Sequence, residues 1–207
     1  MDNSQKQASN RLQKTIIRNR SVFTALFAAL IAVSGFLIIP LPGNIPIVLK
    51  NLFVVLSGTI LGSFYGAIAV LIVLTAGVFY LPVFAAPGPA AFLSPLGGYL
   101  AGYFFGSLAA GLISGLPRAN EKKPDLKLCI KIALASIAGF SLILICGAAY
   151  LTLGHSMSLK TAVYSGIIPF IPVDLIKLAL SIPLAIKLRP IAARYINPLP
   201  ASGRPNA

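Results

Sequence analysis

The chain has 207 residues, of which 57% are hydrophobic and only 10% are charged. Soluble globular domains carry about 25% charged residues, so this composition excludes an ordinary soluble domain and predicts an all-α integral membrane protein. The 17 lysines and arginines outnumber the 4 acidic residues and give a formal net charge of +13. We expect this charge to face anionic lipid and not nucleic acid, because no basic stripe alternates with aromatic residues.

Six apolar segments follow one another along the chain, separated by clusters of proline, glycine and polar residues. They cover residues 21–39, 45–61, 64–84, 92–116, 130–153 and 161–187. A membrane-spanning helix needs about 20 apolar residues, so we predict a bundle of six transmembrane helices in residues 21–188. Residues 1–20 are predicted to form a basic arm and residues 189–207 a tail. The first segment is longer than the apolar core of a signal peptide, which favours a retained helix over a cleaved signal.

The lysines and arginines predict the orientation of the bundle, because cytoplasmic loops are enriched in both. The arm has five, the connection at 118–131 has five, and the last stretch, 187–207, has four. With six spans these three regions share one side of the membrane, and only Lys160 lies on the other. We therefore predict that both termini are cytoplasmic and that the protein is a multi-pass protein of the cell membrane.

Small residues at a spacing of four lie on one helix face and let another helix approach closely. Gly98, Gly102 and Gly106 have this spacing in the fourth segment, where we expect packing inside the bundle. The first segment carries two alanine pairs, Ala25 with Ala29 and Ala28 with Ala32. These pairs are compatible with packing inside the bundle or with contact to another membrane protein.

The scarcity of acids and histidines excludes several classes of enzyme. Paired-carboxylate glycosidases and zinc or iron enzymes need clusters of such residues, whereas the chain has a single histidine, His155. The sequence contains no HExxH, CxxC or GxxxxGK[ST] motif. We therefore predict no catalytic residues, no metal site, no cofactor and no ATP hydrolysis by the chain itself.

Three ionisable residues lie inside apolar segments, where charges are costly and often functional. Asp174 and Lys177 share one face of the last segment at a spacing of three, and Lys50 stands beside Asn51 in the second. One interpretation is that Asp174 and Lys177 only neutralise each other and that Lys50 extends to the membrane surface. The other is that these residues form a binding site, since a buried pair gains little over apolar residues of similar size.

Prolines and aromatic residues around these charges favour the binding site. Pro169 and Pro172 disturb the helix just before the Asp174–Lys177 pair and free carbonyl groups, as in discontinuous helices of membrane transporters. Tyr80, Phe84 and Tyr99 flank the uncharged stretch 85–98, which is either a lid over the bundle or a short connector. The site would suit a partly apolar small molecule with N–H donors and an anionic group.

Three stretches within residues 21–188 carry a family resemblance: NIPIVLKNLFVVLSGTILG, GVFYLPVFAAPGPAAFLSPLGGYLAGY and GIIPFIPVDLIKLALS. In this order and spacing they resemble the BioY family, the biotin-binding S components of energy-coupling factor (ECF) vitamin transporters. The resemblance implies a six-helix subunit that captures biotin from outside and assembles with a transmembrane coupling subunit and two ATPase subunits. A stand-alone, ion-coupled carrier for a small anionic metabolite is the alternative.

The resemblance also assigns roles to particular residues. Asp174 would accept an N–H of the biotin ring and Lys177 would meet a ligand oxygen, while Gly98 and Tyr99 belong to a Gly-Gly-Tyr stretch after the outer loop. The four alanines of the first segment resemble a motif that contacts the coupling subunit. The chain departs from the family at Lys50, where many relatives have an uncharged polar residue, so Lys50 is a candidate for binding the carboxylate of the ligand.

Overall fold

A computed structural model describes residues 3–36, 38–39, 47–84, 88–118 and 125–198, and nearly all of these are helical. The helices are α1 (Asn3–Ser34), α2 (Lys50–Leu61), α3 (Ser63–Val78), α4 (Ala90–Leu93), α5 (Gly97–Ser114), α6 (Leu126–Gly154), α7 (Leu159–Gly166) and α8 (Ile171–Ile196), with a 3₁₀ turn, η1 (Ile168–Phe170), before α8. Two short strands, β1 (Ile38–Ile39) and β2 (Ile47–Val48), pair antiparallel with Ile38 opposite Val48.

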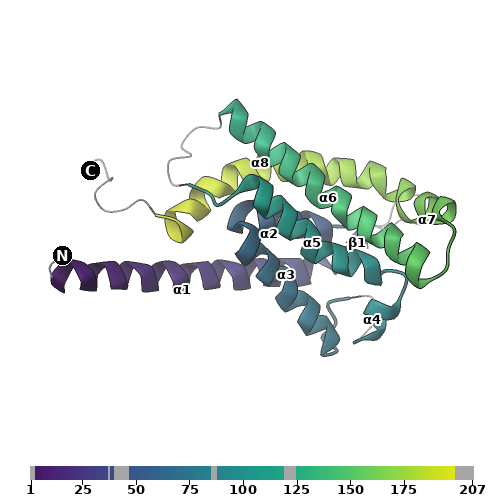
Figure 1. The fold of residues 1–207 in the computed structure, drawn as a ribbon, viewed down its shortest axis with the longest axis horizontal. Helices are drawn as coiled ribbons and strands as arrows, with labels where there is room; N and C mark the ends of the chain where they lie inside the picture. Colours follow the sequence, from purple (N-terminus) through teal and green to yellow (C-terminus); the bar gives the residue numbers. More distant parts are fainter. Residues whose placement is uncertain (1–2, 37, 40–46, 85–87, 119–124, 199–207) are drawn as a thin grey trace.

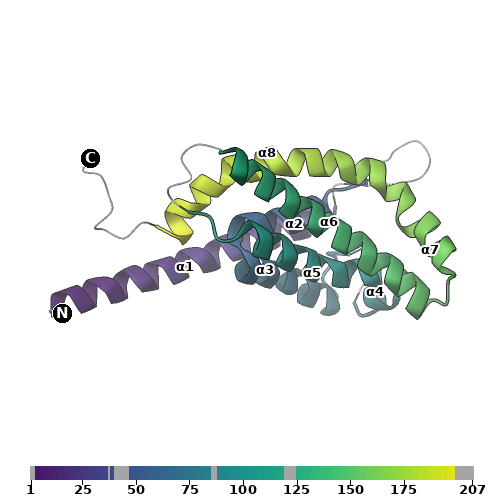
Figure 2. The same ribbon diagram turned by 45° about the horizontal axis from the view of Figure 1, so that its top comes forward.

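The long helices lie side by side in one bundle (Figure 1). The N-terminus of α1 and the C-terminal end of α8 lie at one end of the bundle, and α4 and α7 lie at the other (Figures 1 and 2). We call these the terminal end and the α4/α7 end. The N-terminal part of α1 extends beyond the bundle at the terminal end (Figure 1). There, the Arg20 guanidinium donates to the carbonyl of Ile196, 2.8 Å away, and so joins α1 to the end of α8.

The interior of the bundle is built around α2, which packs against α1, α3, α5, α6 and α8. The α2 residues Val54, Val55 and Ile60 are almost completely buried. Small hydroxyl residues are buried beside them, and the hydroxyls of Ser57 and Ser107 lie 2.9 Å apart. Such small residues let the α2, α3 and α5 backbones approach closely.

The outside of the bundle is apolar, which is the reverse of a soluble protein. Leucine and isoleucine side chains of α6 and α8 are more than half exposed, among them Leu134, Ile145, Leu175 and Ile176. Among the described residues, three stretches are helical, long and apolar enough to cross a bilayer: Asn10–Ser34, Leu126–Gly154 and Leu159–Ile196. The exposed apolar surface therefore faces lipid.

The glycines of α5 pack inside the bundle, as predicted. A side chain at Gly102 would place its Cβ 2.9 Å from the Cα of Ile143, and one at Gly106 would meet the carbonyl of Gly139 at 2.7 Å. Both contacts are with α6, so the absence of side chains on this face of α5 sets the distance between the two helices.

The two alanine pairs of α1 lie in different surroundings. Ala25 and Ala29 are exposed, whereas Ala28 is only 5% exposed and Ala32 is partly buried against the core. The pair Ala28 and Ala32 therefore packs within the bundle, and only Ala25 and Ala29 present a surface on which a partner can pack.

Two boundaries differ from the predicted apolar segments near the N-terminus. The first segment was expected to reach residue 39 and the second to begin at residue 45, but α1 ends at Ser34 and α2 begins at Lys50. The residues between them include both strands, β1 and β2. β-branched isoleucines beside a stretch with three prolines favour extended backbone over helix, which explains the difference.

The last predicted segment is not one continuous helix. It is divided into α7, η1 and α8, with Pro169 inside η1, so the predicted disturbance before Asp174 is present. α8 also continues past residue 188 to Ile196, and α1 runs through residue 20 without a break. Arg189, expected in the tail, is 1% exposed and donates to the carbonyls of Thr59, Ser114 and Gly115 at the C-terminal ends of α2 and α5.

Candidate functional site

A cavity of about 700 Å³ lies at the α4/α7 end of the bundle, a volume typical of sites for small molecules. Its lining comes from the end of α1, the start of α2, the segment after α3, α4, the start of α5, α6, η1 and α8. Lys50, Asn51, Phe84, Tyr99 and Lys177 all line it. The structure thus brings together five of the seven residues that the sequence predicted to bind substrate, from four different parts of the chain.

Asp174 and Lys177 form an ion pair in the first two turns of α8. The Lys177 ammonium lies 2.8 Å from Oδ1 of Asp174, and both side chains are 6% exposed. The other carboxylate oxygen, Oδ2, is buried and has no hydrogen-bond partner among the described residues. Lys177 lines the cavity, whereas Asp174 is not part of its wall. The two charges of the pair neutralise each other, but one carboxylate oxygen, a strong hydrogen-bond acceptor, remains unused.

The surroundings of Asp174 place this acceptor near the cavity. Its Oδ1 lies 2.8 Å from the ammonium of Lys177, which itself lines the cavity. Asp174 also lies in the first turn of α8, where the helix dipole stabilises a negative charge. A buried, unpartnered carboxylate oxygen at this position is suited to accept a hydrogen bond from a ligand N–H.

Lys50 is the first residue of α2 and is only 4% exposed. Its ammonium donates a hydrogen bond to the carbonyl of Val83 and lies 4.5 Å from the centre of the Phe84 ring. The side chain therefore does not extend to the membrane surface, contrary to one interpretation of the sequence. It is held against the cavity by a carbonyl and an aromatic face, neither of which neutralises its charge.

Tyr99 and Gly98 have different roles although they are adjacent. The Tyr99 hydroxyl donates to the carbonyl of Gly166, and its ring lies 5.9 Å from that of Phe170, so it joins α5 to the break before α8. Gly98 does not line the cavity. A Cβ there would lie 2.6 Å from the carbonyl oxygen of Cys146, so Gly98 is needed for the packing of α5 on α6.

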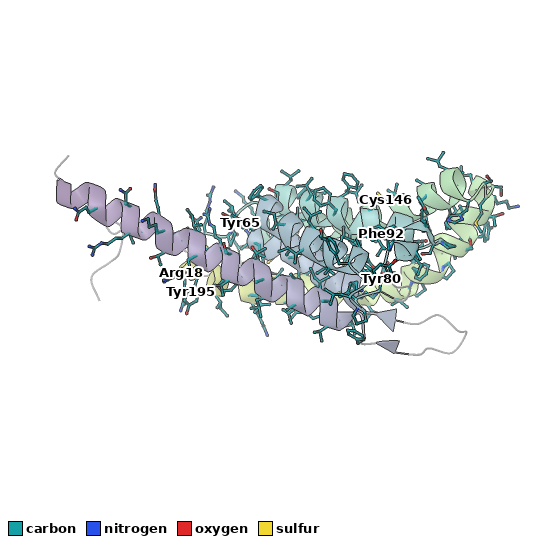
Figure 3. The ribbon with its side chains drawn as sticks, turned by 90° about the horizontal axis from the view of Figure 1, so that it is seen from below. Arg18, Tyr65, Tyr80, Phe92, Cys146 and Tyr195 are labelled. Carbon is teal, nitrogen blue, oxygen red and sulfur yellow. The ribbon has the colours of Figure 1, made fainter. Side chains whose placement is uncertain are left out.

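The stretch 85–98 contributes to the cavity wall in its described part. Ala91, Ser94, Pro95 and Leu96 line the cavity, whereas residues 85–87 lie outside the described residues. Tyr80 is 70% exposed and does not line the cavity, so its expected place at the site is not observed. In Figure 3, Tyr80 and Phe92 lie toward the α4/α7 end, while Arg18 and Tyr195 lie toward the terminal end.

The sequence did not predict several other lining residues, among them Tyr103, Leu144 and Phe170. Tyr103 follows Tyr99 by four positions, so a helical spacing rule applied to Tyr99 would have found it. Phe170 belongs to the turn whose prolines were noted, but its direction depends on η1. Leu144 carries no signal that separates it from other leucines of α6.

This arrangement is suited to reversible binding. Among the described residues, no three His, Cys, Asp or Glu side chains are close enough together to hold a metal ion. The cavity instead combines aromatic and aliphatic walls with two ammonium groups and a nearby carboxylate. Together with the lipid-facing exterior, this defines a helical membrane protein that binds a small polar molecule inside its bundle.

Comparisons with known proteins identify the family. The BioY family model matches residues 5–194, and the chain belongs to this family. The biotin transporter BioY of Thermotoga maritima is 34% identical over 166 residues, which cover 79% of this chain and 92% of that protein. The biotin transporter BioY of Rhizobium etli is 36% identical over 165 residues, covering 75% of this chain and 85% of its own.

A solved structure has the same fold. The crystal structure at 2.1 Å of the S-component for biotin from an ECF-type ABC transporter superimposes with a TM-score of 0.67. It is 28% identical in sequence, and the match covers 91% of this chain and 94% of that one. The shared architecture therefore extends over nearly the whole chain.

Proposed function

We propose that this protein is the high-affinity biotin-binding membrane subunit, or S component, of an ECF-type vitamin uptake transporter. The observation that carries the proposal is the cavity with the buried Asp174–Lys177 pair at its edge, in a chain whose relatives are named biotin transporters. Biotin has two ring N–H groups, an apolar tail and a carboxylate. These match a carboxylate acceptor, apolar walls and an ammonium group.

The free Oδ2 of Asp174 accepts a ring N–H of biotin in this proposal, and Lys177 holds the carboxylate in place through Oδ1 while contributing a donor to the ligand. Tyr99 and Phe84 provide flat apolar walls, and Asn51 adds an amide donor and acceptor beside Lys50. No bond of the ligand has to be broken, which fits a transport subunit and not an enzyme.

The bundle would cross the cell membrane six times, with α1, α2, α3, α5, α6 and α8 as the spans and both termini in the cytoplasm. The common location of the termini and the basic connection before α6 support this orientation. The cavity then opens toward the outside. In a variant without the native cysteines, a cysteine at Lys160 should react with an impermeant maleimide added to intact cells, whereas one at Lys127 should not.

Uptake would require partners, because the chain has no phosphate-binding loop. We propose a transmembrane coupling subunit and two ATPase subunits as these partners. The exposed residues Ala25 and Ala29 give α1 a flat strip of the kind on which a second membrane helix packs. The buried residue Ala28 is not part of this surface.

Binding of biotin to the purified protein in detergent is the direct test. Isothermal titration calorimetry with biotin, its precursor dethiobiotin and an unrelated vitamin should show stoichiometric binding of biotin. Undetectable binding at tens of micromolar would rule out the proposal, since it corresponds to less than about 7 kcal/mol of binding free energy. Uptake into liposomes that contain only this protein, driven by a pH gradient, would instead support the stand-alone carrier.

A further inference from the structure

Lys50 is a buried charge whose partners do not neutralise it. Of the four acidic residues in the sequence, Asp2 and Glu121 lie outside the described residues, and Asp125 stands at the start of α6, toward the terminal end (Figure 1). Asp174 is already paired with Lys177. Within the described part of the chain, the recorded contacts of the Lys50 ammonium are the Val83 carbonyl and the Phe84 ring.

The charge balance of the cavity follows from these contacts. Its described walls and edge hold two ammonium groups and one carboxylate, so they carry one excess positive charge. A buried charge is stable when it is paired, and a ligand that enters such a cavity can provide the pair. This balance selects a ligand with a single negative charge.

The position of Lys50 strengthens the attraction for an anion. Lys50 and Asn51 are the first two residues of α2, so their backbone N–H groups lie at the positive end of a 12-residue helix. No side chain caps this helix start. The ammonium and the amide of Asn51 therefore occupy one wall of the cavity together with a helix N-terminus, which is the chemistry that binds a carboxylate.

Lys177 is less suited to this role. Its ammonium is engaged with Asp174 at 2.8 Å, and its charge is compensated there. The two lysines also come from different elements, the start of α2 and the second turn of α8. The cavity thus has two separate polar regions, one with an uncompensated cation and one with an unused acceptor.

We propose that Lys50 binds the carboxylate of the ligand, and that the Asp174–Lys177 pair binds only its N–H-bearing ring. This assignment rests on the proposed function, because it takes biotin as the ligand. It makes Lys50 the residue that distinguishes an acid from its uncharged amide, while Lys177 positions the carboxylate of Asp174.

Biotin and biotinamide test this assignment, because they differ mainly in the charge at the end of the tail. We expect the wild-type protein to prefer biotin, and Lys50→Gln to weaken biotin roughly 10- to 100-fold, the effect of losing a hydrogen bond to a charged group. Biotinamide should change by less than about threefold, so the preference disappears. Lys50→Arg should restore it.

Lys177→Gln is the informative comparison, because it should weaken both ligands by a similar factor and leave the preference intact. Lys160→Gln, an exposed lysine on α7, is the matched control and should change neither. Calorimetry on each detergent-purified variant measures both constants, and the temperature of helix loss by circular dichroism shows that the variants are folded.

Two results would overturn the assignment and leave biotin binding itself intact. One is a Lys50→Gln protein that still prefers biotin over biotinamide, and the other is a preference lost in Lys177→Gln but kept in Lys50→Gln. A wild-type protein that binds neither ligand would refute the proposed function instead.

Discussion

The Asp174–Lys177 pair allows stability and binding to be separated. If the pair serves only to neutralise two charges, its replacement by apolar residues should leave every property of the protein unchanged. If it binds ligand, the same replacement should remove affinity while the fold persists. We therefore compare Asp174→Asn with the double variant Asp174→Leu/Lys177→Met, in which both charges are absent.

The structure gives the expected magnitudes. Both side chains are 6% exposed and the pair is 2.8 Å long, so Asp174→Asn leaves the Lys177 ammonium buried without its counter-charge. Breaking a buried pair in this way costs about 3–5 kcal/mol of stability. Replacing both members with apolar residues is expected to be neutral or to stabilise the unliganded protein by about 1–4 kcal/mol. Biotin binding should weaken by about 1.5–3 kcal/mol in Asp174→Asn, the value for a hydrogen bond to a charged group.

Circular dichroism in detergent measures the stability, because the chain has no tryptophan for fluorescence. Calorimetry measures the affinity, and Lys187→Met, an exposed lysine on α8, is the matched control for loss of a charge. We expect the double variant to be as stable as the wild type or more stable, and to bind biotin more weakly. A double variant that binds biotin like the wild type would show that the pair has only a structural role.

Three further predictions concern packing and partners. Arg189→Met removes the side chain that donates to the carbonyls of Thr59, Ser114 and Gly115 and should lower stability by about 3 kcal/mol in thermal unfolding, and an unchanged unfolding temperature would contradict its role. Gly102→Ala places a Cβ 2.9 Å from a Cα of α6 and should cost about 1–3 kcal/mol, whereas Ala101→Leu on the exposed face of α5 should change stability by less than about 0.5 kcal/mol. Ala25→Leu/Ala29→Leu should bind biotin normally in detergent but reduce biotin uptake by cells that contain the complete transporter, and normal uptake would exclude this strip as the contact.

The parts of the fold that were predictable are those set by local composition. The glycine spacing of α5 placed a helix contact on one face because a missing Cβ has the same consequence in any bundle. The prolines before Asp174 predicted the break that the structure shows as η1, since proline removes a backbone donor wherever it stands. The charge distribution also predicted an even number of passes; the start of α1 and the end of α8 lie at the same end of the bundle (Figure 1), while the number of passes stays a prediction.

The parts that were not predictable depend on contacts between distant segments. Gly98 was expected at the site with Tyr99, but α6 packs against the position where a side chain of Gly98 would stand. Only the positions of Tyr150 and Cys146 in the fold reveal this contact. Arg189 was expected in a solvated tail, because nothing local marks the ends of α2 and α5 as its acceptors. Lys50 was open to two interpretations until Val83 and Phe84 were seen to hold it inside the bundle.

Burial of a charge does not by itself identify a binding site in this protein. Arg189 is more deeply buried than Lys50 or Asp174, yet the carbonyls that it contacts belong to helix C-termini, which carry partial negative charge. Its charge is therefore compensated by the fold. Lys50 and Asp174 differ because the ammonium has no recorded counter-charge and one carboxylate oxygen has no recorded donor, and both lie at the same cavity or its edge. What identifies a ligand site is thus the kind of partner that the fold leaves missing, and here the missing partners are one anion and one N–H donor.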